Sequence, residues 1–170
     1  NWWGPAGATG PCGPDSEVFF DLNPDGERGE NPASNEARFV EIGNNVFMAY
    51  EKHSDGRYSQ LSQQNVDVGI GLERNLMILQ GCQTVFETEL FVPLIETITR
   101  LAKRPAIFST RVIADHLRSA LFVLAEGVAP GKTDQPYVVR RLIRRAIRCG
   151  HEMGIEGPFL ANLAETVIPT

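Results

Sequence analysis

The sequence predicts an α+β fold, with strands in the first part of the chain and helices in the second. Between residues 17 and 71, three segments are rich in β-branched and aromatic residues and are separated by polar turns. From Leu72 onward, apolar residues recur every three or four positions, which is the period of a helix. The charge changes with the pattern: residues 1–100 hold 6 Lys and Arg against 15 Asp and Glu, and residues 101–170 hold 10 against 6. We therefore expect an acidic part, 1–104, followed by a basic helical part, 105–170.

The strand-rich part begins with a segment of glycines and prolines, residues 4–15, which follows Trp2 and Trp3. We expect this segment to be a loop, because glycine and proline favour turns over regular structure. The predicted strands after it cover residues 17–21, 39–51 and 65–71.

Gly43, Asn44 and Asn45 interrupt the second predicted strand. These residue types tolerate positive φ, so the pattern alone favours a hairpin turn. The alternative is a continuous strand, in which Asn44 and Val46 share one face and the carboxamide can hold a small ligand.

Four helical segments are predicted, two before residue 105 and two after it. Ser109 and Thr110 are candidate caps for the third of them, and Gly81 and Gly127 are candidate stops. The predicted helices cover residues 72–80, 89–103, about 111–126 and about 137–149.

A first candidate site lies where the third strand passes into the first helix. Asp67, Gly69 and Gly71 occupy alternate positions, so they share a strand face that is nearly bare of side chains and carries one carboxylate. Arg74 follows in the first helical turn, where its guanidinium can reach a phosphate. The alternative is structural: the glycines relieve crowding against the helix, and on spacing alone this interpretation is favoured.

A second candidate site is the helix near 137–149. Its apolar residues fill one side, and the other carries only arginines without an acid among them. A solvated face usually mixes both signs of charge, so this pattern favours binding to a phosphate backbone. The arginines are Arg140, Arg141, Arg144, Arg145 and Arg148.

Arg111, Asp115 and Arg118 are spaced to share one face of the preceding helix. They either extend the basic surface, with Asp115 orienting the arginines, or form a structural ladder of ion pairs. The spacing does not choose between these alternatives.

The composition is that of an ordinary soluble globular protein, with 42% apolar and 22% charged residues. No apolar run approaches the roughly 20 residues of a membrane span, and no leader pattern is present, so we expect a cytoplasmic protein. Cys12, Cys82 and Cys149 lie far apart, and we expect no metal site built from cysteine or histidine.

Taken together, several segments resemble the alanyl-tRNA synthetases, which are class II enzymes that activate alanine with ATP and attach it to tRNA. The matching segments follow the family's order over nearly the whole chain. They are TGPCGP at 9–14, EIGNNVFM at 41–48, VDVGIGLER at 66–74, RVIADHLR at 111–118 and YVVRRLIRRA at 137–146.

The resemblance implies that residues 1–104 are the later part of an antiparallel catalytic domain and that residues 105–170 begin a helical tRNA-recognition domain. It also implies an alanine pocket, in which Asp67 accepts the ammonium group. The implied pocket residues are Trp3, Asn44, Val46 and Asp67.

For the other substrates, the resemblance implies that Gly69 and Gly71 give room to ATP, that Arg74 contacts its phosphates, and that Glu41 lies beside Mg²⁺. It further implies a surface facing the acceptor stem of tRNA(Ala), formed by Arg111, Asp115, Arg118, Arg140, Arg141, Arg144 and Arg145.

The sequence departs from the family at three places: Asp15 stands where many members have cysteine, Gly43 stands where tryptophan is usual, and one extra residue precedes Thr9. The last two departures alter walls near the implied pocket. The first two class II signatures are absent from the 170 residues. We therefore expect the chain alone not to activate alanine. The alternative function is a non-catalytic RNA-binding module that kept the basic helices.

Overall fold

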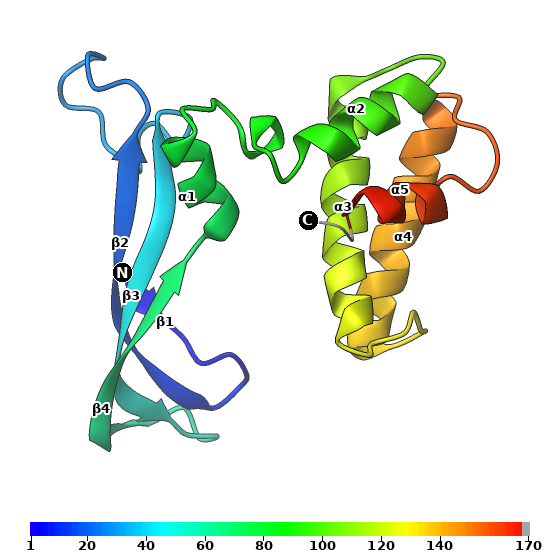
Figure 1. Ribbon diagram of the computed structural model, residues 1–170. Coiled ribbons are helices and arrows are strands. Elements are labelled where there is room, and N and C mark those ends of the chain that lie inside the picture. Colours follow the sequence, from blue (N-terminus) through cyan, green and yellow to red (C-terminus); the bar gives the residue numbers. More distant parts are fainter. Residues whose placement is uncertain (168–170) are drawn as a thin grey trace. The chain divides into compact units, whose positions relative to one another are not determined.

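The computed structural model describes residues 1–167, and the chain divides into two compact units, Asn1–Val85 and the part from Phe86 onward. The first unit holds a sheet and one helix, and the second is helical (Figure 1). This confirms the α+β prediction. The boundary predicted between residues 104 and 105 separates a catalytic domain from a tRNA-recognition domain, whereas the two units here are defined by compactness alone. The predicted domain boundary therefore stays a prediction.

The sheet of the first unit has four antiparallel strands in sequence order (Figure 1). Its helix α1, Leu72–Leu79, follows β4 directly and contacts β3. The strands are β1 (Trp2–Trp3), β2 (Gly10–Asp21), β3 (Phe39–Lys52) and β4 (Tyr58–Ile70).

Two expectations about the strands are wrong. The Gly- and Pro-rich segment is not a loop over residues 4–15, because β2 begins at Gly10 and is paired with β1 on one side and β3 on the other. The hairpin turn expected at Gly43-Asn44-Asn45 is also absent, and β3 runs through it. Pairing on both sides overrides the local preference for a turn: Asn44, for example, lies opposite both Glu17 and Gly69.

One face of the sheet is apolar and exposed. Directly paired residues share a face, so the pairs Phe47–Val66 and Val18–Gly43–Ile70 identify its members. The exposed side chains of this apolar face are Val18, Phe47, Val66, Val68 and Ile70.

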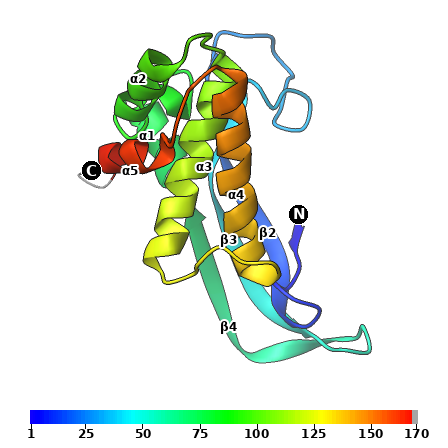
Figure 2. The ribbon, with the colours of Figure 1, turned by 90° about the vertical axis from the view of Figure 1, so that its right-hand side faces the viewer.

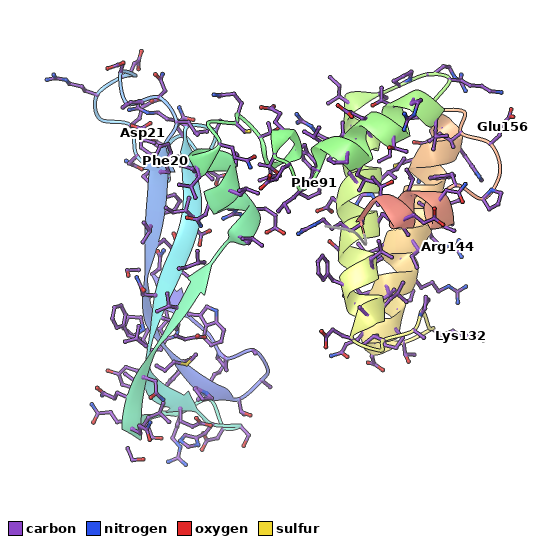
Figure 3. The ribbon with its side chains drawn as sticks, viewed as in Figure 1. Phe20, Asp21, Phe91, Lys132, Arg144 and Glu156 are labelled. Carbon is purple, nitrogen blue, oxygen red and sulfur yellow. The ribbon has the colours of Figure 1, made fainter. Side chains whose placement is uncertain are left out.

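The long loop between β2 and β3 is anchored by Arg38, whose side chain is largely buried. Its guanidinium donates two hydrogen bonds of 2.7 Å to the carboxylate of Asp21 and one of 2.8 Å to Glu30. These contacts lower the pKa of Asp21, and hydrogen bonds from Asn35 and Arg38 lower the pKa of Glu30. The anchor lies at the end of β2, where Figure 3 labels Asp21.

In the second unit, helices α3 and α4 pack side by side over most of their length (Figure 2). Two shorter helices contact α3 and each other, and a 3₁₀ turn at Val85–Glu87 precedes the four helices. The helices are α2 (Val92–Leu101), α3 (Ile107–Ala125), α4 (Asp134–Glu152) and α5 (Leu160–Val167).

The helix boundaries differ from the prediction for identifiable reasons. Helix α2 begins at Val92 instead of 89, because Pro93 is tolerated only in a first turn. Helix α3 begins at Ile107, so Ser109 and Thr110 do not cap it. Both are buried within its first turns, where the Thr110 hydroxyl donates a hydrogen bond to the Met153 sulfur at 3.6 Å.

The apolar sides of α4 and α5 are buried in the core of the second unit. Apolar side chains from all four helices and the segment before α5 are buried together; α5 itself was not predicted. Its members include Leu94, Ile98, Ile113, Leu117, Val139, Ala146, Met153, Phe159 and Leu163. No helix among residues 1–167 combines the length and the apolar character that crossing a bilayer requires.

Candidate functional site

The predicted alanine-pocket residues of β3 and β4 lie on one face of the sheet. Asn44 pairs with Gly69, and Val46 pairs with Asp67, and directly paired residues point to the same side. This side is opposite to the exposed apolar face. The strand β2 extends both rows, because Glu17 pairs with Asn44, and Asp15 with Val46. We call this side the Asn44 face: Asp15, Glu17, Asn44, Val46, Asp67 and Gly69.

A β-bulge brings Glu41 to the Asn44 face. Strict alternation along β3 would place odd and even residues on opposite sides. However, Val18 pairs with Gly43 and Phe19 pairs with Glu41, so Ile42 is an extra residue in β3. The insertion reverses the alternation, and Glu41 joins Asn44 on one side.

Helix α1 is fixed to this bulge by its first turn. The Arg74 guanidinium donates hydrogen bonds to the Glu41 carbonyl at 2.8 Å and to the Glu41 carboxylate at 3.1 Å. The Ile42 carbonyl accepts one hydrogen bond from the Gly71 backbone at 3.1 Å and one from the Asn75 side chain at 2.8 Å. Arg74 is therefore held beside the sheet, with about half of its side chain exposed.

Glu41 and Arg74 line a cavity of about 700 Å³ in the first unit. Phe19 and Phe39 contribute apolar walls, Glu17 and Glu36 contribute carboxylates, and the loop anchored by Arg38 closes one side. A volume of this size is within the range of small-molecule sites. The sequence had singled out only two of these residues. The remaining lining residues are Asn1, Asn31, Pro32, Ala33 and Val40.

Asp67 lines a different hollow, of about 470 Å³, together with Met48 and Asn65. The predicted alanine and ATP residues are thus neighbours on one face, but Asp67 and Arg74 do not line the same cavity. Val46, between Asp15 and Asp67, is buried. The Asp15 Oδ1 atom is also buried, and no hydrogen-bond donor reaches it among residues 1–167.

Gly69 leaves room for the side chain of its partner across the sheet. A Cβ atom at this position would lie 2.5 Å from the Asn44 Oδ1 atom, which is closer than such contacts allow. From the sequence, the structural interpretation was that Gly69 and Gly71 relieve crowding between the strand and the helix that follows it. The structure instead shows crowding against Asn44, because Gly71 would meet only the Arg74 stem at ordinary distances.

The two tryptophans lie in β1. Trp3, the predicted pocket residue, pairs with Gly13 and is half-buried. The ring of Trp2 lies 5.6 Å from that of Tyr50 and 5.9 Å from that of Tyr58. Trp2 is therefore the indole in contact with aromatic rings of β3 and β4.

The basic side of α4 is confirmed as an amphipathic surface in the second unit. Val139 and Ala146 are buried, while Arg141, Arg144 and Arg145 are exposed or partly exposed. Within residues 1–167, no acidic side chain forms an ion pair with these three arginines or with Arg140. The positive charge of this surface is therefore not neutralised by any ion pair among the described residues.

Arg148 differs from the other arginines of α4. Its Nε atom donates to the Glu152 carboxylate at 2.9 Å, and this ion pair one helical turn away raises the Arg148 pKa.

Arg111 and Arg118 on α3 face aromatic rings. The Arg111 guanidinium lies 5.1 Å from the Phe86 ring centre, and that of Arg118 lies 5.4 Å from Phe91 and 5.1 Å from Phe122. The Asp115 Oδ2 atom lies 2.8 Å from the Nδ1 atom of the His116 ring, which is a hydrogen-bonding distance.

These contacts within the unit affect how much of Arg111, Asp115 and Arg118 is accessible to a ligand. Both guanidiniums lie against aromatic rings of the same unit, and both residues are half-buried, whereas Arg141, Arg144 and Arg145 of α4 are exposed. Whether these three residues contact RNA stays a prediction.

The second unit also has a hollow that the sequence did not predict. It measures about 510 Å³ and is lined by Lys132, Tyr137, Arg140, Arg141 and Arg144. Three of these residues were singled out from the sequence. Lys132 and Tyr137 were missed, although Tyr137 stands three and four positions before two of the arginines, which is the spacing of helical neighbours.

Among residues 1–167, no three His, Cys, Asp or Glu side chains are placed to hold a metal ion together. Mg²⁺ in phosphate-binding sites is bound by one or two carboxylates together with the phosphates. Glu41 beside Arg74 satisfies that smaller requirement.

Comparison with known proteins gives relatives over almost the whole chain. It is 46% identical to an alanine–tRNA ligase of Treponema pallidum and 45% identical to one of Treponema denticola, in both cases over 99% of this chain. An alanine–tRNA ligase of Petrotoga mobilis is 44% identical over the same share. The chain spans 29%, 30% and 20% of the length of these three relatives.

A family model described as "tRNA synthetases class II (A)" matches residues 1–170, which is the full sequence. The antiparallel sheet and the helices that follow it agree with this match. The chain therefore belongs to the class II (A) family of tRNA synthetases.

Proposed function

We propose that this chain is a portion of an alanine–tRNA ligase, in which the first unit supplies one wall of the alanyl-adenylate site and the second begins the tRNA-binding part. The observation that carries the proposal is the Asn44 face. Pairing brings Asn44, Asp67 and Gly69 onto it, and the bulge adds Glu41, which is bonded to Arg74. The names of the relatives supply the substrates.

The reaction we propose is activation of alanine by ATP. An oxygen of the alanine carboxylate attacks the α-phosphorus, and the bond from that phosphorus to the β-phosphate oxygen breaks, so pyrophosphate leaves. In the second step, a hydroxyl of the tRNA acceptor end attacks the activated carbonyl, and AMP leaves.

The residues contribute binding and positioning rather than proton transfer. Asp67 accepts the alanine ammonium, Asn44 orients the substrate, and Arg74 stabilises the phosphate charge. Gly69 and Gly71 leave room for the nucleotide, while Trp3 and Val46 complete the alanine wall. Mg²⁺, held near Glu41, neutralises phosphate charge when bound.

The exposed apolar face of the sheet supports the proposal of a longer enzyme. Large contiguous apolar patches are uncommon on independent soluble domains and mark surfaces that other protein covers. Phe47, Val66 and Ile70 are exposed on one face of the sheet. We expect further sequence of the complete ligase to cover it.

The activity test is ATP–pyrophosphate exchange with alanine, run on the 170-residue chain and on the longest product of the same gene. We expect alanine-dependent exchange from the longer product and none from the chain alone. Robust exchange by the chain alone would contradict the proposal that it is an incomplete site. Absence of exchange from the longer product, with RNA binding retained, would favour the non-catalytic RNA-binding module.

The tRNA-binding surface has its own test, in which Arg141 and Arg145 are both replaced by Ala. We expect weaker binding of tRNA(Ala) and a slope of log K against log salt that is flatter by about two units, because two phosphates are no longer neutralised by the protein. Fluorescence anisotropy at several salt concentrations measures both quantities. Arg148→Ala is the matched control, because its charge is already paired with Glu152 and its removal should change the slope little.

Unchanged affinity and slope in the double variant would remove α4 from the RNA-binding surface. Arg111, Asp115 and Arg118 would then be the next residues to test, since they remain proposed contacts of the acceptor stem.

A further inference from the structure

The hollow at the start of α4 combines an aromatic ring with four cations. Tyr137, Arg140, Arg141 and Arg144 stand at positions i, i+3, i+4 and i+7, so they form one stripe along the helix. Lys132 adds a fourth cation from the preceding loop. Figure 3 shows Lys132 in that loop and Arg144 further along α4. We call this hollow the Tyr137 pocket.

The loop that carries Lys132 is held in place by its own backbone. The Gly131 N–H donates a hydrogen bond of 2.9 Å to the Pro136 carbonyl, so the loop folds back onto the first turn of α4. The approach is close: a Cβ atom on Gly131 would lie 2.6 Å from the Pro136 Cβ atom. Lys132 is therefore kept beside Tyr137 by a compact loop.

The charge of the Tyr137 pocket selects for an anion. Within residues 1–167, none of its four cations forms an ion pair with an acidic side chain, and Asp134 at the start of α4 forms none with them. Four unneutralised charges around about 510 Å³ favour a phosphate group.

The ring of Tyr137 indicates which kind of phosphate-bearing ligand fits. About 48% of this residue is exposed, so the ring is not committed to the core. The backbone of a duplex needs only cations, because its bases are stacked inside. A cationic groove with an exposed aromatic ring is the arrangement that binds single-stranded nucleic acid, in which the phosphate meets the cations and the base stacks on the ring.

We propose that the Tyr137 pocket binds one unpaired nucleotide of an RNA, with its phosphate held by Lys132 and the arginines and its base stacked on Tyr137. This rests on the proposed function, since it assigns part of the RNA-binding surface to a nucleotide outside the duplex. It adds Lys132 and Tyr137 to the residues expected from the sequence.

The experiment uses two RNA hairpins with the same stem, one blunt-ended and one with a short single-stranded 3′ extension, titrated against the 170-residue chain. We expect Tyr137→Ala to weaken binding of the extended hairpin about tenfold and to leave the blunt hairpin unchanged. Tyr137→Phe should bind both hairpins like the original chain, because it keeps the ring. Arg148→Ala is the control for a change elsewhere on α4 and should affect neither hairpin.

The outcomes separate this inference from the proposed function. If the original chain binds both hairpins and Tyr137→Ala binds the extended one equally well, stacking on Tyr137 is wrong while the RNA-binding surface stands. Equal weakening for both hairpins overturns the inference as well, because it identifies a contact to the duplex. If the original chain binds neither hairpin, the RNA-binding function itself fails.

Discussion

Replacing Gly13 by Ala is expected to lower the free energy of unfolding of the sheet unit by about 3 kcal/mol or more, because no space exists for the added methyl group. A Cβ atom at Gly13 would lie 1.9 Å from the Phe47 carbonyl oxygen and 3.0 Å from its carbonyl carbon. Both atoms belong to the backbone of β3, so no side-chain rotation relieves the overlap. The strands β2 and β3 have to separate.

The expected damage reaches the candidate site, because Gly13 lies in the irregular stretch between Cys12 and Asp15 and pairs with Trp3 on its other side. Urea denaturation followed by tryptophan fluorescence measures the effect, since both tryptophans of the chain, Trp2 and Trp3, lie in β1. Circular dichroism at helical wavelengths reports mainly on the second unit and should change less.

Gly4→Ala is the matched control for Gly13→Ala. A Cβ atom at Gly4 would meet nothing within 4 Å, so the same chemical change should leave the urea midpoint nearly unchanged. If the two variants unfold at the same urea concentration, β2 and β3 are further apart at this point than the structure places them.

The regular features of the fold followed from local sequence patterns, and the errors arose where pairing partners decided the structure. The apolar period of α4 and the absence of acids on its other side were sufficient to predict a basic amphipathic helix. At Gly43-Asn44-Asn45, by contrast, local preference favoured a turn. Neighbours on both sides extend these residues, and those neighbours are distant from them in the chain, as Glu17 and Gly69 are from Asn44.

In the candidate site, too, local patterns predicted some features and distant pairing partners decided others. Alternation correctly placed Asp67 and Gly69 on one face, because β4 is regular between them. It could not place Glu41 on that face, because the bulge at Ile42 is defined by the register against β2. Nor could spacing reveal that the guanidinium of Arg118 lies over Phe91, since that ring precedes α2 and reaches α3 only through tertiary packing.

Gly69→Ala, made in the longest product of the gene, is expected to lower kcat/KM for alanine in the exchange reaction about 30-fold or more. The KM for ATP should rise by less, because Gly69 also leaves room for the nucleotide but the added Cβ atom meets the Asn44 side chain directly. The added Cβ atom would lie 2.5 Å from the Asn44 Oδ1 atom, so the carboxamide has to rotate out of its place on the Asn44 face. Removing one or two positioned hydrogen bonds to a small substrate costs about 2 kcal/mol, which corresponds to that change in rate. Stability should change little, because the displaced atom is the end of a side chain.

Gly7→Ala is the control for Gly69→Ala, since a Cβ atom there would meet only the Thr9 carbonyl oxygen at 3.8 Å, an ordinary contact. Two results would contradict the expected role of Asn44. Unchanged kinetics for alanine in Gly69→Ala would mean that the carboxamide does not touch the substrate. An equal decrease for alanine and ATP, accompanied by a lower urea midpoint, would mean that the substitution disturbs the sheet as a whole. A selective decrease for alanine ties the pairing of Asn44 with Gly69 directly to recognition of the amino acid.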